Sequence, residues 1–128
     1  MKKILLLGLF FLCFSLSAQT VIIRTSDYAV KTTEDWSEWE AASLLIAIDE
    51  NTIKIDNQLE EIFYIRSAEK TKTGVDENGN YTRHILLCFD KNGVGCYFMW
   101  KFWHDIDVIL CEILYLDISY TYLGNKIN

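Results

Sequence analysis

Apolar side chains recur at every second position over much of this chain, and turn residues interrupt the alternation at short intervals. A period of two is typical of β-strands, in which successive side chains point to opposite faces of a sheet. The pattern is clearest over residues 81–103, where two aromatic-rich runs flank the turn residues 91–93 (KNG). The sequence therefore predicts a central antiparallel hairpin, with the rest of the domain built around it.

The turn of this hairpin predicts its register. A three-residue loop at 91–93 puts Gly93 in the left-handed region, so that Cys88 faces Cys96 across the two strands. Both faces are then apolar near the turn. One carries Leu86, Cys88, Cys96, Phe98, Trp100 and Phe102, and the other carries Ile85, Leu87, Phe89, Tyr97 and Met99. Because an antiparallel sheet needs only one apolar face, we expect a second layer, a barrel wall or a partner subunit to cover the other.

Further strands are expected over residues 20–31, 40–48, 53–55, 62–71 and 109–123. Before the second of these, Thr33 and two acidic residues resemble a helix start, which predicts a short turn or single helical turn at 33–38. A helix continuing through Ala47 is the alternative. Asn78-Gly79 is a strong signal for a hairpin with a type I′ turn. The fold expected is all-β, with one short helix allowed near the mature N-terminus.

Architecture and domain count follow from these elements. About seven strands in an antiparallel meander are expected to form a small barrel or a two-layer sandwich. Lys2 and Lys3 precede an apolar run over residues 4–16, and small residues follow it, which predicts a secretory signal peptide at 1–18. That run is shorter than the roughly 17–25 residues of a spanning helix. We therefore expect one β domain over 19–128, secreted or periplasmic, with no membrane span after cleavage.

The charge balance limits the partners. Without Lys2 and Lys3, 10 basic residues stand against 18 acidic ones, a net charge of −8 spread along the chain. Nucleic acids and anionic membranes need clustered positive charge, so the sequence argues against both.

Three cysteines remain after residue 18, namely Cys88, Cys96 and Cys111. An exported protein with an odd number is expected to hold one bridge and one free thiol. Opposed residues of neighbouring antiparallel strands lie within disulfide reach, so the sequence predicts a Cys88–Cys96 disulfide across the hairpin. Another pairing and three free thiols are the alternatives.

Catalytic and metal-binding patterns are missing from the sequence. It lacks Gly-x-Ser-x-Gly, His-Glu-x-x-His and a phosphate-binding glycine loop. The two histidines, His84 and His104, do not form a zinc-binding pattern, and the Asp/Asn-rich loops lack the spacing of a calcium-binding loop. We therefore expect neither catalysis nor a metal or cofactor. A hydrolase would require a cleft in which carboxylates or these histidines converge.

The aromatic side chains are the remaining candidates for binding. Trp103 and Tyr81 face each other at the open end of the hairpin, and Trp100 and Tyr97 are further aromatics of its second strand, so these four are the candidate ligand or partner contacts. We expect an exported, non-catalytic interaction module that binds another protein, or itself, through an apolar sheet face. The alternative is a lipocalin-like carrier of a small apolar ligand, which would need an internal cavity.

Overall fold

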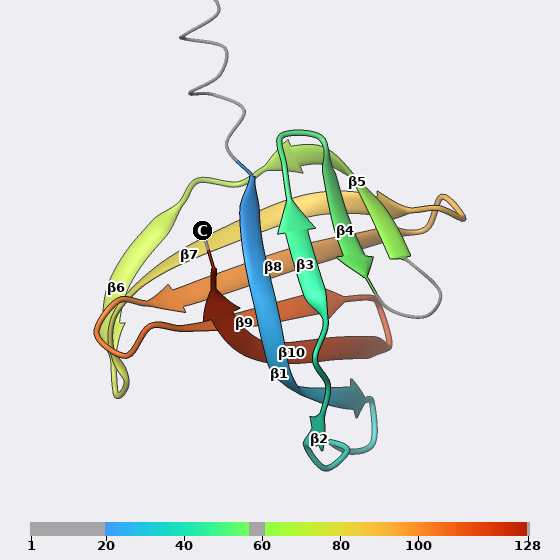
Figure 1. Ribbon diagram of the computed structural model, residues 1–128. Coiled ribbons are helices and arrows are strands. Elements are labelled where there is room, and N and C mark those ends of the chain that lie inside the picture. Colours follow the sequence, from blue (N-terminus) through green and yellow to red (C-terminus); the bar gives the residue numbers. More distant parts are fainter. Residues whose placement is uncertain (1–19, 57–60, 128) are drawn as a thin grey trace, which may run out of the picture.

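A computed structural model describes residues 20–56 and 61–127, and within them the chain forms antiparallel strands and no helix (Figure 1). This confirms the predicted fold class, whereas the predicted signal peptide lies outside the described residues. The strands are Val21–Thr32 (β1), Glu40–Ala41 (β2), Leu45–Ile48 (β3), Thr52–Asp56 (β4), Glu61–Ala68 (β5), Lys72–Asp76 (β6), Gly79–Asp90 (β7), Gly95–Trp103 (β8), Val108–Leu114 (β9) and Ile118–Lys126 (β10).

Eight of these strands close into a barrel. Their order around the ring is β1-β3-β4-β5-β7-β8-β9-β10, and β10 pairs back onto β1. The short strand β2 pairs with β1, and β6 pairs with β7, both outside this ring. Closure gives each long strand two partners, which removes the unpaired edges of an open sheet. Of the two predicted architectures, the barrel is the one formed.

The barrel closes along a seam between β1 and β10 that contains a bulge between Thr25 and Asp27. The two backbones come very close at Gly124. A Cβ on this residue would lie 2.8 Å from the Cα of Thr25 and would overlap the carbonyl oxygen of Arg24. Glycine is therefore needed here for space, because any larger residue would push the two strands apart.

Inward positions of the barrel form the core. Ile53 pairs with Ile48 on one side and with Phe63 on the other, and all three are buried. Isoleucine suits these positions because a β-branched side chain packs well on a pleated surface. Further core side chains are Ile23, Ile46, Ile55, Cys88, Cys96, Phe98, Ile109, Cys111, Ile113 and Tyr122.

The register of the central hairpin is confirmed. Cys88 pairs with Cys96, and the same alignment runs through to Tyr81 and Trp103. In the turn, the Gly93 N–H donates to the Asp90 carbonyl at 2.9 Å, and Gly93 has a φ of 81°. These are the features expected of a type I turn followed by a left-handed glycine.

The single strand predicted over 109–123 is wrong. The chain reverses between β9 and β10, where the Tyr115 N–H donates to the Ile118 carbonyl at 2.9 Å. Leu116 sits in this turn and is fully exposed. The sequence hid the turn because it contains neither glycine nor proline, and because the apolar alternation continues in phase across it.

Two local predictions near other turns also need correction. Of the short turn or single helical turn predicted at 33–38, the structure has the short turn, because Lys31 and Trp36 pair in an antiparallel bridge around a bend at 33–34. The alternative of a helix through Ala47 is wrong, because this segment runs along β1 as β2 and β3. The Asn78-Gly79 hairpin is present between β6 and β7, but its turn is not type I′. Asp76 pairs with Gly79, and Asn78 is not among the residues with positive φ. The additional short strands and the missed turn explain why ten strands are described where about seven were predicted.

Candidate functional site

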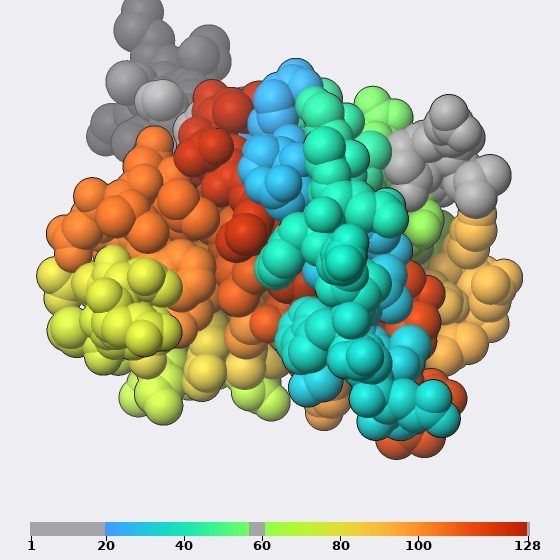
Figure 2. All heavy atoms as spheres, turned by 90° about the horizontal axis from the view of Figure 1, so that it is seen from below, coloured from blue at the N-terminus to red at the C-terminus, as the bar shows by residue number. Residues whose placement is uncertain are grey.

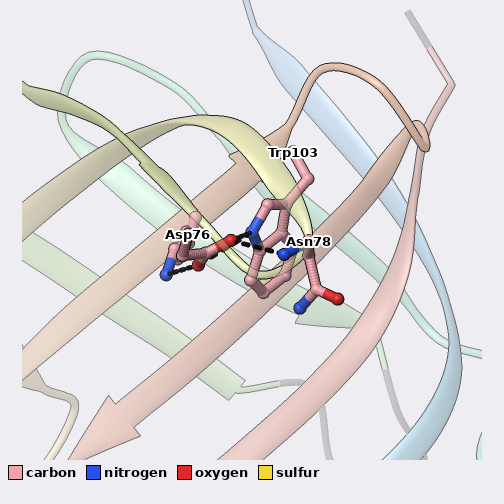
Figure 3. Close-up of polar contacts among 4 residues, drawn as sticks. Asp76, Asn78 and Trp103 are labelled. Carbon is pink, nitrogen blue, oxygen red and sulfur yellow. Dashed lines mark hydrogen bonds and ion pairs between the residues drawn. The ribbon is translucent and has the colours of Figure 1, made fainter.

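Trp103 and Tyr81 lie opposite each other as predicted, but Trp103 is not displayed. Its side chain is 7% exposed, and its indole N–H donates to Asp76 Oδ1 at 2.9 Å (Figure 3). Lys101 Nζ pairs with Asp76 Oδ2 at 2.7 Å and lies 4.1 Å from the centre of the Tyr81 ring. We call these four residues the Asp76 clasp. It fastens β6 onto β8, which is a structural role.

The other two aromatic candidates lie elsewhere. Trp100 is half-buried on the inner face, with its ring centre 4.7 Å from that of His84. Tyr97 is on the outer face and is 44% exposed. The structure therefore does not bring the four predicted contacts together: two belong to the clasp, one to the barrel interior and one to the outer surface.

The predicted Cys88–Cys96 disulfide is not formed, although the register that motivated it is correct. Both side chains are buried in the barrel, and Cys88, Cys96 and Cys111 are free thiols. The Asp90 N–H donates to the Val94 carbonyl, so the alternation of the ladder puts the cysteine pair at a hydrogen-bonded site, an unfavourable place for a bridge. Burial raises the pKa of Cys88 to about 12 and that of Cys96 to about 11, which keeps both thiols protonated.

The outer face of the hairpin carries the second apolar surface predicted from the sequence. Ile85, Leu87, Phe89 and Met99 are half-buried there. Neighbouring Tyr64 on β5 is 52% exposed. The inner face is covered by the barrel wall, which accounts for one of the two apolar faces. The outer face has only partial cover within the described residues.

One end of the barrel opens into a cavity of about 640 Å³, which we call the mouth cavity. It lies where the β7–β8 and β9–β10 turns meet the second half of β1 and the beginning of β5, on the opposite side of the molecule from β6 (Figure 1). The teal segment that includes β2 crosses the molecular surface beside β1 (Figure 2). Ala42 and Leu44, which follow β2, contribute to the cavity wall.

Four tyrosines form a continuous wall of the mouth cavity. The ring of Tyr28 lies 5.1 Å from that of Tyr122 and 6.4 Å from that of Tyr120, measured between centroids. Tyr115 meets Tyr120 edge to face at 6.3 Å, and its hydroxyl donates to Asp90 Oδ2 at 2.9 Å. Edge and offset arrangements of this kind are the favoured geometries of aromatic pairs.

Two carboxylates face the interior at the same end. Asp90 pairs with Phe63, and Glu61 pairs with Ile55, so both share the side of the sheet that holds buried core residues. They stand on β5 and β7, and in the ring order β5 lies across the barrel from β10. The cavity therefore has tyrosines on one wall and carboxylates on the facing wall.

Burial is the main reason that the pKa values of Tyr28, Tyr115 and Tyr122 are raised. For Tyr115 the hydrogen bond to Asp90 adds to this effect, and the negative charge of Glu61 raises all three further. The hydroxyls therefore stay neutral. Burial also raises the pKa of Asp90, but hydrogen bonds from Val94, Tyr115 and Asn92 outweigh it and leave that pKa below its usual value.

Sequence reasoning missed this site because it missed one turn. In a continuous strand, Tyr115 would face away from Tyr120 and Tyr122, so the three could not share a wall. The reversal at Leu116 and Asp117 brings them to one side. Asp117 was the available signal, since aspartate favours turns.

The described residues show no other kind of site. Neither His84 nor His104 lines the mouth cavity. Over residues 20–56 and 61–127, no group of three or more potential metal ligands gathers. The same residues contain no apolar helix long enough to cross a bilayer. Comparison with known proteins gives no match to a family model, a curated protein or a solved structure.

Proposed function

We propose that this is an exported, non-catalytic binding protein that holds a small ligand in the mouth cavity. The volume of the cavity carries the proposal, because about 640 Å³ lies within the roughly 300–1,000 Å³ of typical small-molecule sites. Its lining fits the same class: apolar and aromatic side chains dominate, and a few polar groups are available to orient a ligand.

Two observations narrow this function. Deeper in the barrel, the interior is filled by Ile53, Phe98, Ile109 and their neighbours, so a ligand would sit at the mouth rather than in an enclosed central chamber. The Asp90 carboxylate has a lowered pKa and accepts three hydrogen bonds, so it is suited to accept hydrogen bonds and unsuited to release a proton near neutral pH. The first observation places the ligand at the mouth, and the second favours binding over proton transfer by Asp90.

Blocking the cavity tests this proposal. Nile red, a neutral dye that becomes fluorescent in apolar surroundings, serves as the probe. Ala42→Trp places a large ring in the cavity wall, and Val94→Trp adds the same ring at an exposed position outside it. We expect Ala42→Trp to abolish dye binding and Val94→Trp to leave it intact.

Dye binding to the outer face of the central hairpin is the competing explanation. Tyr64 and Tyr97 are exposed there, and a protein-interaction module would use such a surface. If Tyr97→Ser removed dye binding while Ala42→Trp did not, the proposal of a mouth-cavity ligand would be wrong.

A further inference from the structure

We infer that the mouth cavity selects organic cations, namely compact amines with an aromatic or apolar body. This inference rests on the proposed function, because it names the ligand class of the same cavity. It goes beyond that function by separating amines from neutral and acidic molecules of similar size, whereas a purely apolar carrier would favour the neutral molecule.

The first support is the charge of the lining. Glu61 and Asp90 face inward, and Lys91 is the one cationic residue among the described residues that line the cavity. The influence of Glu61 reaches three tyrosines of the opposite wall, whose pKa values it helps to raise. The negative charges of Glu61 and Asp90 disfavour a ligand carboxylate in this cavity and favour an ammonium group.

The second support is the tyrosine wall. Ring faces attract cations through their quadrupole, and aromatic cages are a known solution for binding ammonium groups. Tyr28, Tyr120 and Tyr115 are half-buried at the cavity, so their rings are accessible to a ligand. The hydrogen bond from Tyr115 to Asp90 joins this wall to the acidic wall. Aromatic faces and carboxylates therefore act on the same space.

The position of these groups gives an orientation for the ligand. Phe63 and Tyr122 are 2% and 5% exposed and form the deeper, apolar part of the lining. Glu61 begins β5 and Asp90 ends β7, so the carboxylates lie nearer the opening. An amine would place its apolar body against the two buried rings and its ammonium group between the carboxylates and the tyrosine wall.

A matched series of three probes tests the inference by calorimetric titration: 2-phenylethylammonium, neutral 2-phenylethanol and anionic 3-phenylpropionate. We expect the amine to bind about tenfold more tightly than the alcohol, and the carboxylate to bind most weakly. Glu61→Gln and Asp90→Asn should each reduce the preference for the amine. Asp76→Asn removes the same formal charge from the clasp at the other end and should leave the preference unchanged.

Each outcome decides something. If the three probes bind equally, or the carboxylate binds best, the selection of cations is wrong while the ligand cavity stands. If none of the three binds at millimolar concentration, the inference is also wrong, and the Nile red experiment decides the proposed function separately. An equal loss of preference in Asp76→Asn would attribute the effect to net charge and would overturn the role of the cavity walls.

Discussion

The two ends of this barrel are built from the same strands and differ in what their inward positions carry. At the closed end, Ile48 and Ile53 fill the interior, and the Asp76 clasp fastens β6 onto the outer face of β8. At the mouth, tyrosines and carboxylates occupy the inward positions and leave a cavity of about 640 Å³. β7 runs from one environment to the other, beginning beside the clasp and ending at Asp90 in the mouth.

This difference shows how a small barrel can separate stability from binding. Branched aliphatic side chains fill the interior and carry no polar atoms that would need a hydrogen-bond partner there. Tyrosine has a large apolar body with a polar tip, so it can line an opening that is partly wet. At the mouth the Tyr115 hydroxyl also donates to Asp90, which limits the cost of burying that tyrosine in part.

Truncating one isoleucine at each end should produce the largest contrast in stability. Ile53→Ala removes a fully buried side chain and should lower the free energy of unfolding by about 2–5 kcal/mol. Ile118→Ala removes a half-buried side chain that already borders the mouth cavity, so its cost should be about 1 kcal/mol. Urea denaturation of both variants measures this difference. Equal losses would show that the mouth is packed like the core.

A smaller effect is expected at the seam that holds both ends together. Gly124→Ala would force apart β1 and β10 beside Thr25 and should destabilise the barrel by about 1–3 kcal/mol. Gly95→Ala is the matched control, because a Cβ there meets only the Phe89 ring at 3.6 Å. Thermal unfolding compares the two. A destabilisation confined to Gly95→Ala would contradict the close approach at the seam.

The smallest effect concerns pH. Burial lowers the pKa of His84 below 6.5, so the unfolded chain binds more protons than the folded one just below that pH. Stability should therefore be full above pH 6.5 and fall as the pH drops through the lowered pKa. Unfolding of the parent and of His84→Gln between pH 7 and pH 5 measures this. Asp90→Asn should keep the slope, because the pKa of Asp90 lies below 3.8. If His84→Gln kept the same pH dependence of stability, that dependence would come from other groups.

Of the two turns that meet at the mouth, the sequence predicted the one between β7 and β8 and missed the one between β9 and β10. Period-two alternation and the glycine turn at 91–93 were enough to place Cys88 opposite Cys96 in the correct register. The turn at Leu116 and Asp117 could not be found in the same way, because the alternation runs through it. Missing it separated Tyr115 from Tyr120 and concealed the wall they share. A cavity depends on the far ends of strands meeting in space, which local patterns do not encode.

Nuclear magnetic resonance mapping of 2-phenylethylammonium on the isotope-labelled protein tests the central claim most directly. We expect the shift changes to centre on Tyr28, Tyr115 and Asp90, with the signals of Asp76 and Trp103 at the closed end unmoved. Shift changes centred on Tyr97 and Met99, or on the Asp76 clasp, would contradict the assignment of binding to the mouth of the barrel.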